Sequence, residues 1–186
     1  MINFKNTTDP LEEVHDIVDK NNKAISTGTR KEFLQNPKLI RRSAHIWLQN
    51  SKGQWWMQQR SKTKDLQPLH WQSACSGFIR AGAKTKPAFL KEAQRELKEE
   101  LGITTPLKLV KTIKMPGLTV GGIIVYWYIG KYEGPFKINR EEIKDFGAFD
   151  LKEVWTDYCK EKIKLTDPFV KELDYFIKYP KMFKGI

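Results

Sequence analysis

Apolar residues recur along this chain with two spacings, one typical of helices and one of strands. In the segment from Ala93 to Leu101 they recur every three or four residues, and Gly102 follows, which predicts a helix that ends at the glycine. Thr85 and Pro87 stand where a helix cap and a first turn are expected, so the helix is predicted to begin there. Runs rich in β-branched and aromatic residues predict strands. The predicted strands are residues 12–18, 24–27, 42–48, 55–59, 71–79, 107–114 and 122–132.

Capping residues predict where other helices begin. Thr29 is followed three residues later by Glu32, and Asp150 by Glu153, which is the spacing of a capping box. The dipeptide Asp167-Pro168 is typical of the first turn of a helix. The helices predicted from these signals span residues 30–35, 151–160 and 167–178.

Three carboxylates fall on one edge of the long predicted helix. At about 100° per residue, Glu96, Glu99 and Glu100 lie within a quarter-turn, and leucines form an adjoining apolar stripe. Like charges this close repel one another, and oxygen ligands favour Mg²⁺ or Mn²⁺. This edge is therefore a candidate metal site. The alternative is a solvated face stabilised by pairs such as Arg95 with Glu99.

The order of residues around these acids is more specific than their charge. Residues 95–103 read Arg-Glu-Leu-Lys-Glu-Glu-Leu-Gly-Ile, which resembles the second half of the signature of the Nudix family, hydrolases of nucleoside diphosphates linked to another group. The first half of the signature can be read from Gly77. There the chain departs from the pattern, because Ala83 replaces the first glutamate and eleven residues, instead of seven, separate it from Arg95.

The resemblance implies a fold, a chemistry and a set of site residues. The fold would be an α/β/α sandwich around a mixed β-sheet, and the activity would be metal-dependent hydrolysis of a diphosphate linkage in a nucleotide or related small molecule. Glu99 and Glu100 would bind Mg²⁺ or Mn²⁺, and Glu96 would bind the metal or orient the attacking water. Arg95 would hold the loop of the signature by pairing with an acid. The expected catalytic residues are thus Glu96, Glu99 and Arg95, and the further suggested metal ligands are Glu142 and a backbone carbonyl at Ser76 or Gly77.

The order of segments also resembles the branch of this family that contains isopentenyl diphosphate isomerase. That enzyme moves protons with a cysteine and a glutamate and holds a metal with histidines and glutamates. Here Ser76 stands at the cysteine position, and Cys75, one residue earlier, faces the other side of a strand. Arg41 stands at the position of the isomerase's first metal-binding histidine. The Glu-X-Glu pair of the isomerase would fall on residues 120–122, which contain no acid. His45, alone at a strand position, is expected to be a core or hydrogen-bonding residue.

The altered loop leaves a third possibility, a Nudix-fold binding module without turnover. The four extra residues are about one helical turn, so they are expected to lengthen the helix and leave the carboxylates in register. They include Lys84 and Lys86, which are predicted to favour anionic substrates. Hydrolysis remains the favoured reading, with the isomerase and the binding module as alternatives.

Composition limits the remaining possibilities. With 186 residues, 40% of them hydrophobic, and no internal repeat, residues 1–186 are predicted to form a single domain. The two cysteines, Cys75 and Cys159, form neither a CxxC pair nor a disulfide framework, and there is no secretory signal, so a cytoplasmic location is expected. The predicted parts of the domain are an N-terminal hairpin at about 12–28, the signature region at 77–103 and C-terminal helices at about 151–178.

Charge and hydropathy bear on the partners. The net charge is +11, but no RNA-binding motif accompanies the basic residues, which favours a lysine-rich surface over a nucleic-acid partner. The longest apolar run, residues 121–129, is about half the length of a membrane span, so no membrane partner is expected. The expected partner is a small-molecule diphosphate, and no feature of the sequence sets the oligomeric state.

Overall fold

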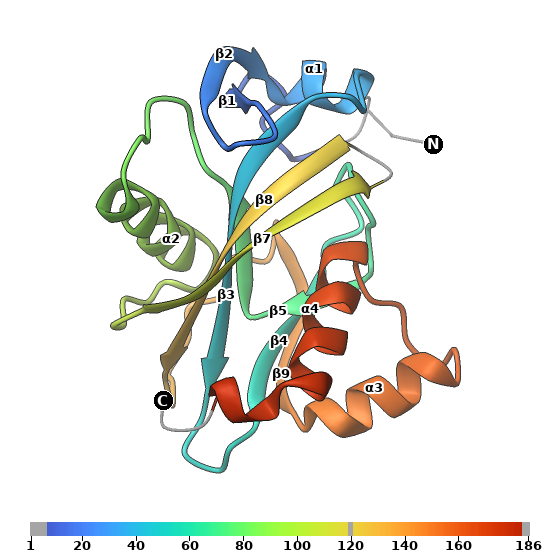
Figure 1. Ribbon diagram of the computed structural model, residues 1–186. Helices are drawn as coiled ribbons and strands as arrows, with labels where there is room; N and C mark the ends of the chain where they lie inside the picture. The colour runs from blue at the N-terminus through green and yellow to red at the C-terminus, as the bar shows by residue number, and fades with distance from the viewer. Residues whose placement is uncertain (1–6, 119–120, 184–186) are drawn as a thin grey trace.

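A mixed β-sheet of seven strands forms the centre of the molecule in a computed structural model that describes residues 7–118 and 121–183 (Figure 1). The central strand, β3 (Ile40–Gln49), runs parallel to β8 (Gly121–Lys131) and antiparallel to β6 (Cys75–Phe78). β8 pairs on its other side with β7 (Lys108–Leu118). The remaining strands of the sheet are β4 (Trp55–Arg60), β5 (Trp71–Ser73) and β9 (Ile143–Phe149).

The sheet divides beside β3. β3 pairs with β4 only through Leu48 and Gln49, next to the turn that joins the two strands. Farther along, β4 pairs instead with β5 and β9, while β6 takes the place beside β3. The two halves of the sheet therefore separate, and residues of both halves line one cavity.

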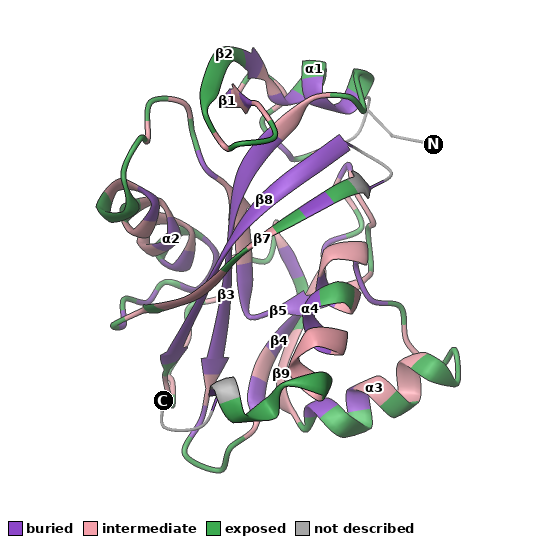
Figure 2. Ribbon diagram, in the orientation of Figure 1, coloured by how far each residue is buried: buried purple, intermediate pink, exposed green. Residues whose placement is uncertain are grey.

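Helices cover both faces of the sheet, which makes the molecule an α/β/α sandwich around a mixed sheet, as predicted. α2 (Lys86–Leu101) packs on one face with β8 residues such as Tyr126, and α3 (Leu151–Cys159) and α4 (Asp167–Lys178) pack on the other with residues such as Trp127 (Figure 1). β8 is buried along nearly its whole length because both of its faces are covered (Figure 2). A short 3₁₀ helix, η1 (Pro180–Phe183), follows α4.

The ends of α2 follow from local sequence. Thr85 caps the helix, its side chain accepting a hydrogen bond from the Ala88 amide at 3.4 Å, and Pro87 lies in the first turn. Gly102 ends the helix in the left-handed conformation, with φ of 66°. The helix therefore begins with the extra residues of the altered loop, as predicted from the sequence.

The N-terminal part lies over one end of the sheet (Figure 1). β1 (Val14–Val18) and β2 (Ala24–Thr29) form a separate antiparallel hairpin, and α1 (Arg30–Gln35) follows directly. The predicted capping box of α1 is present, because the Thr29 and Glu32 side chains each bond to the other residue's backbone amide. The helix thereby brings Arg30 to the cavity.

Two expectations about strands are wrong. Residues 71–79 do not form one strand but two, β5 and β6, with Ala74 between them, because β5 pairs with β4 and β6 pairs with β3 after the sheet has divided. β9 was not expected from the sequence, and it begins at Ile143, directly after the suggested metal ligand Glu142. Residue 120, part of the segment compared with the isomerase acids, lies outside the described residues. No helix within the described ranges is long and apolar enough to cross a membrane.

Candidate active site

A cavity of about 710 Å³ lies between the two halves of the sheet. α2 and β6 form one wall, and the other is formed by β4, β5 and the loop between them, with the first turn of α4 at one end. All four of the acids expected at the site line this cavity, and so does Arg95. The four acids are Glu96, Glu99, Glu100 and Glu142.

Glu96 lies against the backbone of β6. Its side chain is only 12% exposed, and it approaches Gly77 so closely that a Cβ on the glycine would lie 2.0 Å from the Glu96 carboxyl carbon. Glycine is therefore required at this position by the close approach of the carboxylate. Burial, with a further contribution from the charge of Glu100, raises the pKa of Glu96 to about 8.

Glu100 is the most buried of the carboxylates on the helix, at 8% exposure. The Gln58 amide donates a hydrogen bond to it at 2.6 Å, and the thiol of Cys75 is also hydrogen-bonded to it. Burial and the nearby charge of Glu142 raise the pKa of Glu100 to about 7. Glu96 and Glu100 do not belong to a solvated helix face, so that alternative is wrong for these two residues.

Glu99 differs from its neighbours, because its side chain is 55% exposed and pairs with Arg95 at 2.5 Å, as expected for a solvated face. The Arg95 guanidinium also pairs with Glu96 and, at 3.1 Å, with Glu92. Arg95 was expected to hold the loop by pairing with an acid. In the structure Arg95 pairs with Glu92, and Glu92 pairs with Arg80 of the loop.

Glu142 reaches the cavity from the segment before β9. Its carboxylate pairs with Lys64, which also pairs with Asp9. The backbone adds to this arrangement, because the Glu142 carbonyl accepts a hydrogen bond from the Ser61 amide at 2.9 Å. The loop after β4 and the residue before β9 are thus joined at the cavity wall, and Glu142 lies close enough to Glu100 to affect its pKa.

Whether these side chains fit a metal depends on Arg95. In residues 7–118 and 121–183, no group of three or more His, Cys, Asp or Glu side chains converges so that it could hold a metal ion. The Arg95 guanidinium occupies the space between Glu96 and Glu99. The donor chemistry nevertheless fits a hard divalent cation, since Glu96 and Glu100 are shielded from water and repel each other. A cation there would compete with Arg95 for Glu96 and Glu99.

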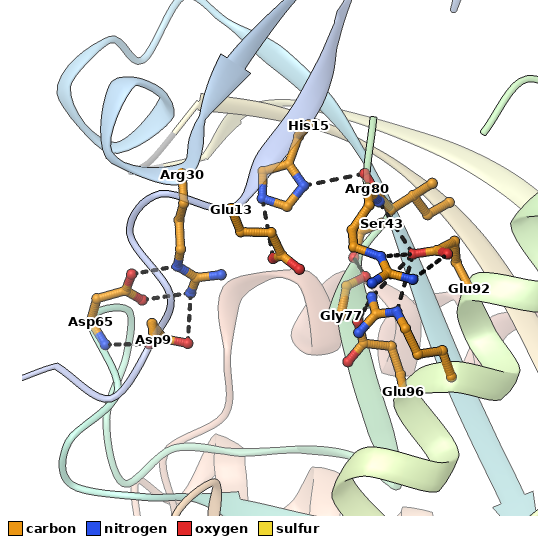
Figure 3. A network of polar contacts seen from close by, with 12 residues as sticks. Asp9, Glu13, His15, Arg30, Ser43, Asp65, Gly77, Arg80, Glu92 and Glu96 are labelled. Carbon is orange, nitrogen blue, oxygen red and sulfur yellow. Dashed lines mark hydrogen bonds and ion pairs between the residues drawn. The ribbon is translucent and has the colours of Figure 1, made fainter. Parts of the chain in front are cut away.

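The cavity that contains the carboxylates also has a basic wall, which was not predicted from the sequence. It consists of Arg30, Arg60 and Lys64. Arg30 is buried and bonds to Asp65 through two nitrogens, at 2.7 and 2.8 Å, and to Asp9 at 3.0 Å. Figure 3 shows Arg30 with Asp9 and Asp65 on one side and Gly77 with Glu96 on the other. The available signal was the pair Lys62 and Lys64, two of the basic residues that the net charge led us to assign to a lysine-rich surface.

Arg41, at the position of the isomerase's first metal histidine, does not line the cavity. Its guanidinium lies 3.4 Å from the centre of the Phe78 ring and 4.9 Å from that of Phe33. Burial, together with the charge of Arg30, lowers its pKa to about 9. A buried cation in this place repels a metal ion, where a histidine would bind one.

Comparisons with known proteins identify the family and the fold. The chain is 28% identical to isopentenyl-diphosphate Delta-isomerase 2 of Photorhabdus laumondii over 145 residues, which cover 76% of this chain and 79% of that protein. It is 33% identical to an uncharacterized Nudix hydrolase of Listeria innocua over 107 residues, covering 55% of this chain and 60% of the relative. Among solved structures, DR0079 of Deinococcus radiodurans shares the fold with a TM-score of 0.73 and 18% identity, covering 88% of this chain and 98% of that one. The profile of the NUDIX domain matches residues 39–173, so this chain belongs to the Nudix family.

Proposed function

We propose that this protein is a metal-dependent hydrolase that cleaves a diphosphate linkage in a nucleotide or a related small molecule. One observation carries the proposal. The shielded carboxylates Glu96 and Glu100 and the basic residues Arg30, Arg60 and Lys64 line the same cavity. Acidic oxygens suit a divalent cation, and guanidinium and ammonium groups suit phosphoryl oxygens. A diphosphate with its metal requires both.

Each group has a proposed role. Glu99 and Glu100, with Glu142 as a further candidate, would hold Mg²⁺ or Mn²⁺, and Glu96 would hold the metal or orient the attacking water. When bound, the metal supplies positive charge next to the phosphoryl oxygens. Arg95, which pairs with Glu96 and Glu99, would offset the repulsion between these carboxylates when no metal is bound. The loop of Arg80 is fixed to the same helix through Glu92.

The basic wall would bind the diphosphate. Lys64 is held between Asp9 and Glu142, and Arg30 between Asp9 and Asp65, so both cations are positioned before substrate arrives. Because these cations are already in position, they can stabilise the negative charge that develops during phosphoryl transfer, and the protein does not have to reorganise first. Asp9 and Glu142 keep these cations neutralised, and a diphosphate would compete with the two carboxylates for Lys64.

An isomerase is the second candidate, because the matched relatives include isopentenyl-diphosphate isomerases. The site residues argue against it. Ser76 stands where the catalytic cysteine is expected, and Arg41 where the first metal histidine is expected. Cys75 faces α2 in the apolar cluster, on the other side of β6 from Ser76, and it does not line the cavity.

Two assays separate these candidates. We expect the purified protein with Mg²⁺ or Mn²⁺ to hydrolyse at least one member of a panel of nucleotide diphosphates that includes ADP-ribose, with products identified by chromatography. Glu96→Gln should abolish the activity, and Glu141→Gln, the same change at an exposed residue outside the cavity, should not. Conversion of labelled isopentenyl diphosphate to its isomer would establish the isomerase instead. Metal-independent binding of these compounds without turnover would identify a binding module.

A further inference from the structure

A histidine and a buried glutamate form a second polar group in the cavity, apart from the Nudix signature. His45 lies on β3 and lines the cavity, and its Nδ1 is hydrogen-bonded to Glu172 of α4. The other carboxylate oxygen of Glu172 accepts a hydrogen bond from the Trp47 indole at 2.9 Å. Glu172 has no exposed surface, and residues 127 apart in sequence are thus held together.

Burial of the Glu172 carboxylate costs free energy, which a purely structural residue at this position would not need to cost. α4 is otherwise packed through apolar residues such as Phe169 and Leu173, and Trp47 is at the centre of that cluster. A buried carboxylate is tolerated where its hydrogen-bond partners are in place, yet an apolar side chain of similar size usually packs at least as well. The presence of an acid at this buried position therefore points to the residue it holds, His45.

The partners of Glu172 determine which nitrogen of His45 is available. A carboxylate can only accept hydrogen bonds, so Nδ1 of His45 carries the proton in this pair. Within the described part of the chain, no protein group is hydrogen-bonded to Nε2. In the neutral imidazole Nε2 is then an acceptor, open to a ligand in the cavity. Glu172 and Trp47 fix its direction.

The surroundings of His45 indicate what that ligand would be. Ser43 of β3 and Ser76 of β6 line the cavity near His45. In the pairing of β3 with β6, His45 lies directly opposite Ser76. Phe78 and Phe169 also line the cavity and supply apolar surface. This combination suits a group that has both a flat or apolar surface and hydrogen-bonding atoms. An unbranched or branched alkenyl chain would leave Nε2 without a partner.

We propose that His45 is a specificity-determining residue whose Nε2 accepts a hydrogen bond from the organic group attached to the diphosphate. The ligand class is a diphosphate whose organic group carries a hydroxyl, amino or amide N–H donor. Glu172 is a positioning residue in this proposal, since it acts through His45. The inference rests on the proposed function only for the presence of a diphosphate.

Nitrogen-15 spectra of the histidine rings test the contact without turnover. In EDTA, addition of ADP-ribose should shift the Nε2 resonance of His45, whereas isopentenyl diphosphate, which has no donor on its organic group, should leave it unchanged. His70, which does not line the cavity, is the internal control. Equal responses to the two compounds, or no response of Nε2 to ADP-ribose, would overturn the proposal.

Variants test the same contact through affinity. His45→Phe together with Glu172→Gln removes the histidine and the buried charge and keeps a side-chain oxygen that can accept from the Trp47 indole, so the fold is expected to survive. This double variant should bind ADP-ribose about five- to tenfold more weakly, the effect of one hydrogen bond, with unchanged affinity for isopentenyl diphosphate. His70→Phe should alter neither. An equal loss of affinity for ADP-ribose and isopentenyl diphosphate would mean that His45 and Glu172 have only a structural role. Because binding is measured in EDTA, a failure of hydrolysis would count against the proposed function alone.

Discussion

A Cβ on Gly77 would lie 2.0 Å from the carboxyl carbon of Glu96, so the strand before the signature helix and the Glu96 side chain of that helix are packed in direct contact. Nothing larger than glycine fits unless Glu96 moves. The same contact shields the Glu96 carboxylate from water.

Gly77→Ala should therefore displace Glu96 and weaken Mn²⁺ binding, and overpacking of this kind typically destabilises by about 1–3 kcal/mol. Gly82→Ala is the control. Gly82 has φ of +90° and no atom within 4 Å of an added Cβ, so its replacement strains the backbone without touching Glu96. Chemical denaturation and Mn²⁺ calorimetry on both variants would check this, and unchanged Mn²⁺ affinity in Gly77→Ala would show that the contact does not support the metal site.

Cys75 is expected not to take part in catalysis. Its thiol is buried on the α2 side of β6, and burial, with the charge of Glu100, raises its pKa well above the usual range. Cys75→Ala should keep turnover within a few fold, and loss of the buried sulfur should cost about 1 kcal/mol of stability. A loss of turnover of a hundredfold or more, with circular dichroism unchanged, would favour the isomerase.

Lys84 and Lys86 are exposed and do not line the cavity, so they can act on a substrate only through long-range attraction. Changing both to Gln should raise KM for a polyphosphate substrate about twofold at low salt and not at 0.5 M salt, because surface charges are screened. Lys64→Gln should raise KM more, and at both salt concentrations, because Lys64 is in the cavity wall. Steady-state kinetics at two ionic strengths would measure this. An equal increase in KM at high salt for the Lys84 and Lys86 double variant and for Lys64→Gln would contradict this difference between surface and cavity lysines.

His15 gives the protein a pH-dependent stability. Its ring is fully buried, Nδ1 donates to the Ile79 carbonyl at 3.2 Å, and burial, with the charge of Arg41, lowers its pKa to about 3. Although Glu13 lies 3.5 Å from Nε2, the low pKa means that the ring is neutral and the two do not form an ion pair.

Because the folded state binds this proton more weakly than the unfolded state, the contribution of His15 is fully present above about pH 6.5 and is lost as pH falls toward about 3. The slope from one such group is at most about 1.4 kcal/mol per pH unit. In His15→Phe the free energy of unfolding, measured by urea denaturation from pH 4 to 7, should show a smaller decrease with falling pH than in the wild type. Identical slopes would mean that the pKa of His15 is the same in the folded and unfolded states, and would contradict this prediction.

The parts of the structure that could be predicted from sequence are those set by local signals. α2 begins after Thr85 and ends before Gly102 because capping and turn preferences act over a few residues. The order of Glu96, Glu99 and Glu100 on one edge follows from helical geometry alone. The strand register also held, since Cys75 and Ser76 lie on opposite faces of β6.

The missed features depend on contacts between distant residues. Lys64 and Glu142 are 78 residues apart, and only the pairing of β4 with β9 brings them to one cavity wall. The segment of β9 contains Lys144, Asp145 and a glycine, so it lacks the apolar alternation that identifies a strand, and its pairing with β4 supplies what the sequence pattern does not. The same reasoning applies to His45 and Glu172, whose relationship is visible only when α4 is packed on β3.

The most direct test of the central claim, that the carboxylates on α2 form a divalent metal site, is calorimetric titration of Mn²⁺ into the wild type and Glu100→Gln. The substitution removes a charge and keeps the shape, and Glu100 is buried against Gln58, so the helix should remain folded by circular dichroism. Glu141→Gln, an exposed change of the same kind, is the control. We expect Glu100→Gln to bind Mn²⁺ at least tenfold more weakly, while Glu141→Gln binds as the wild type does. Equal Mn²⁺ affinity in the wild type and Glu100→Gln would mean that the α2 carboxylates do not form the metal site.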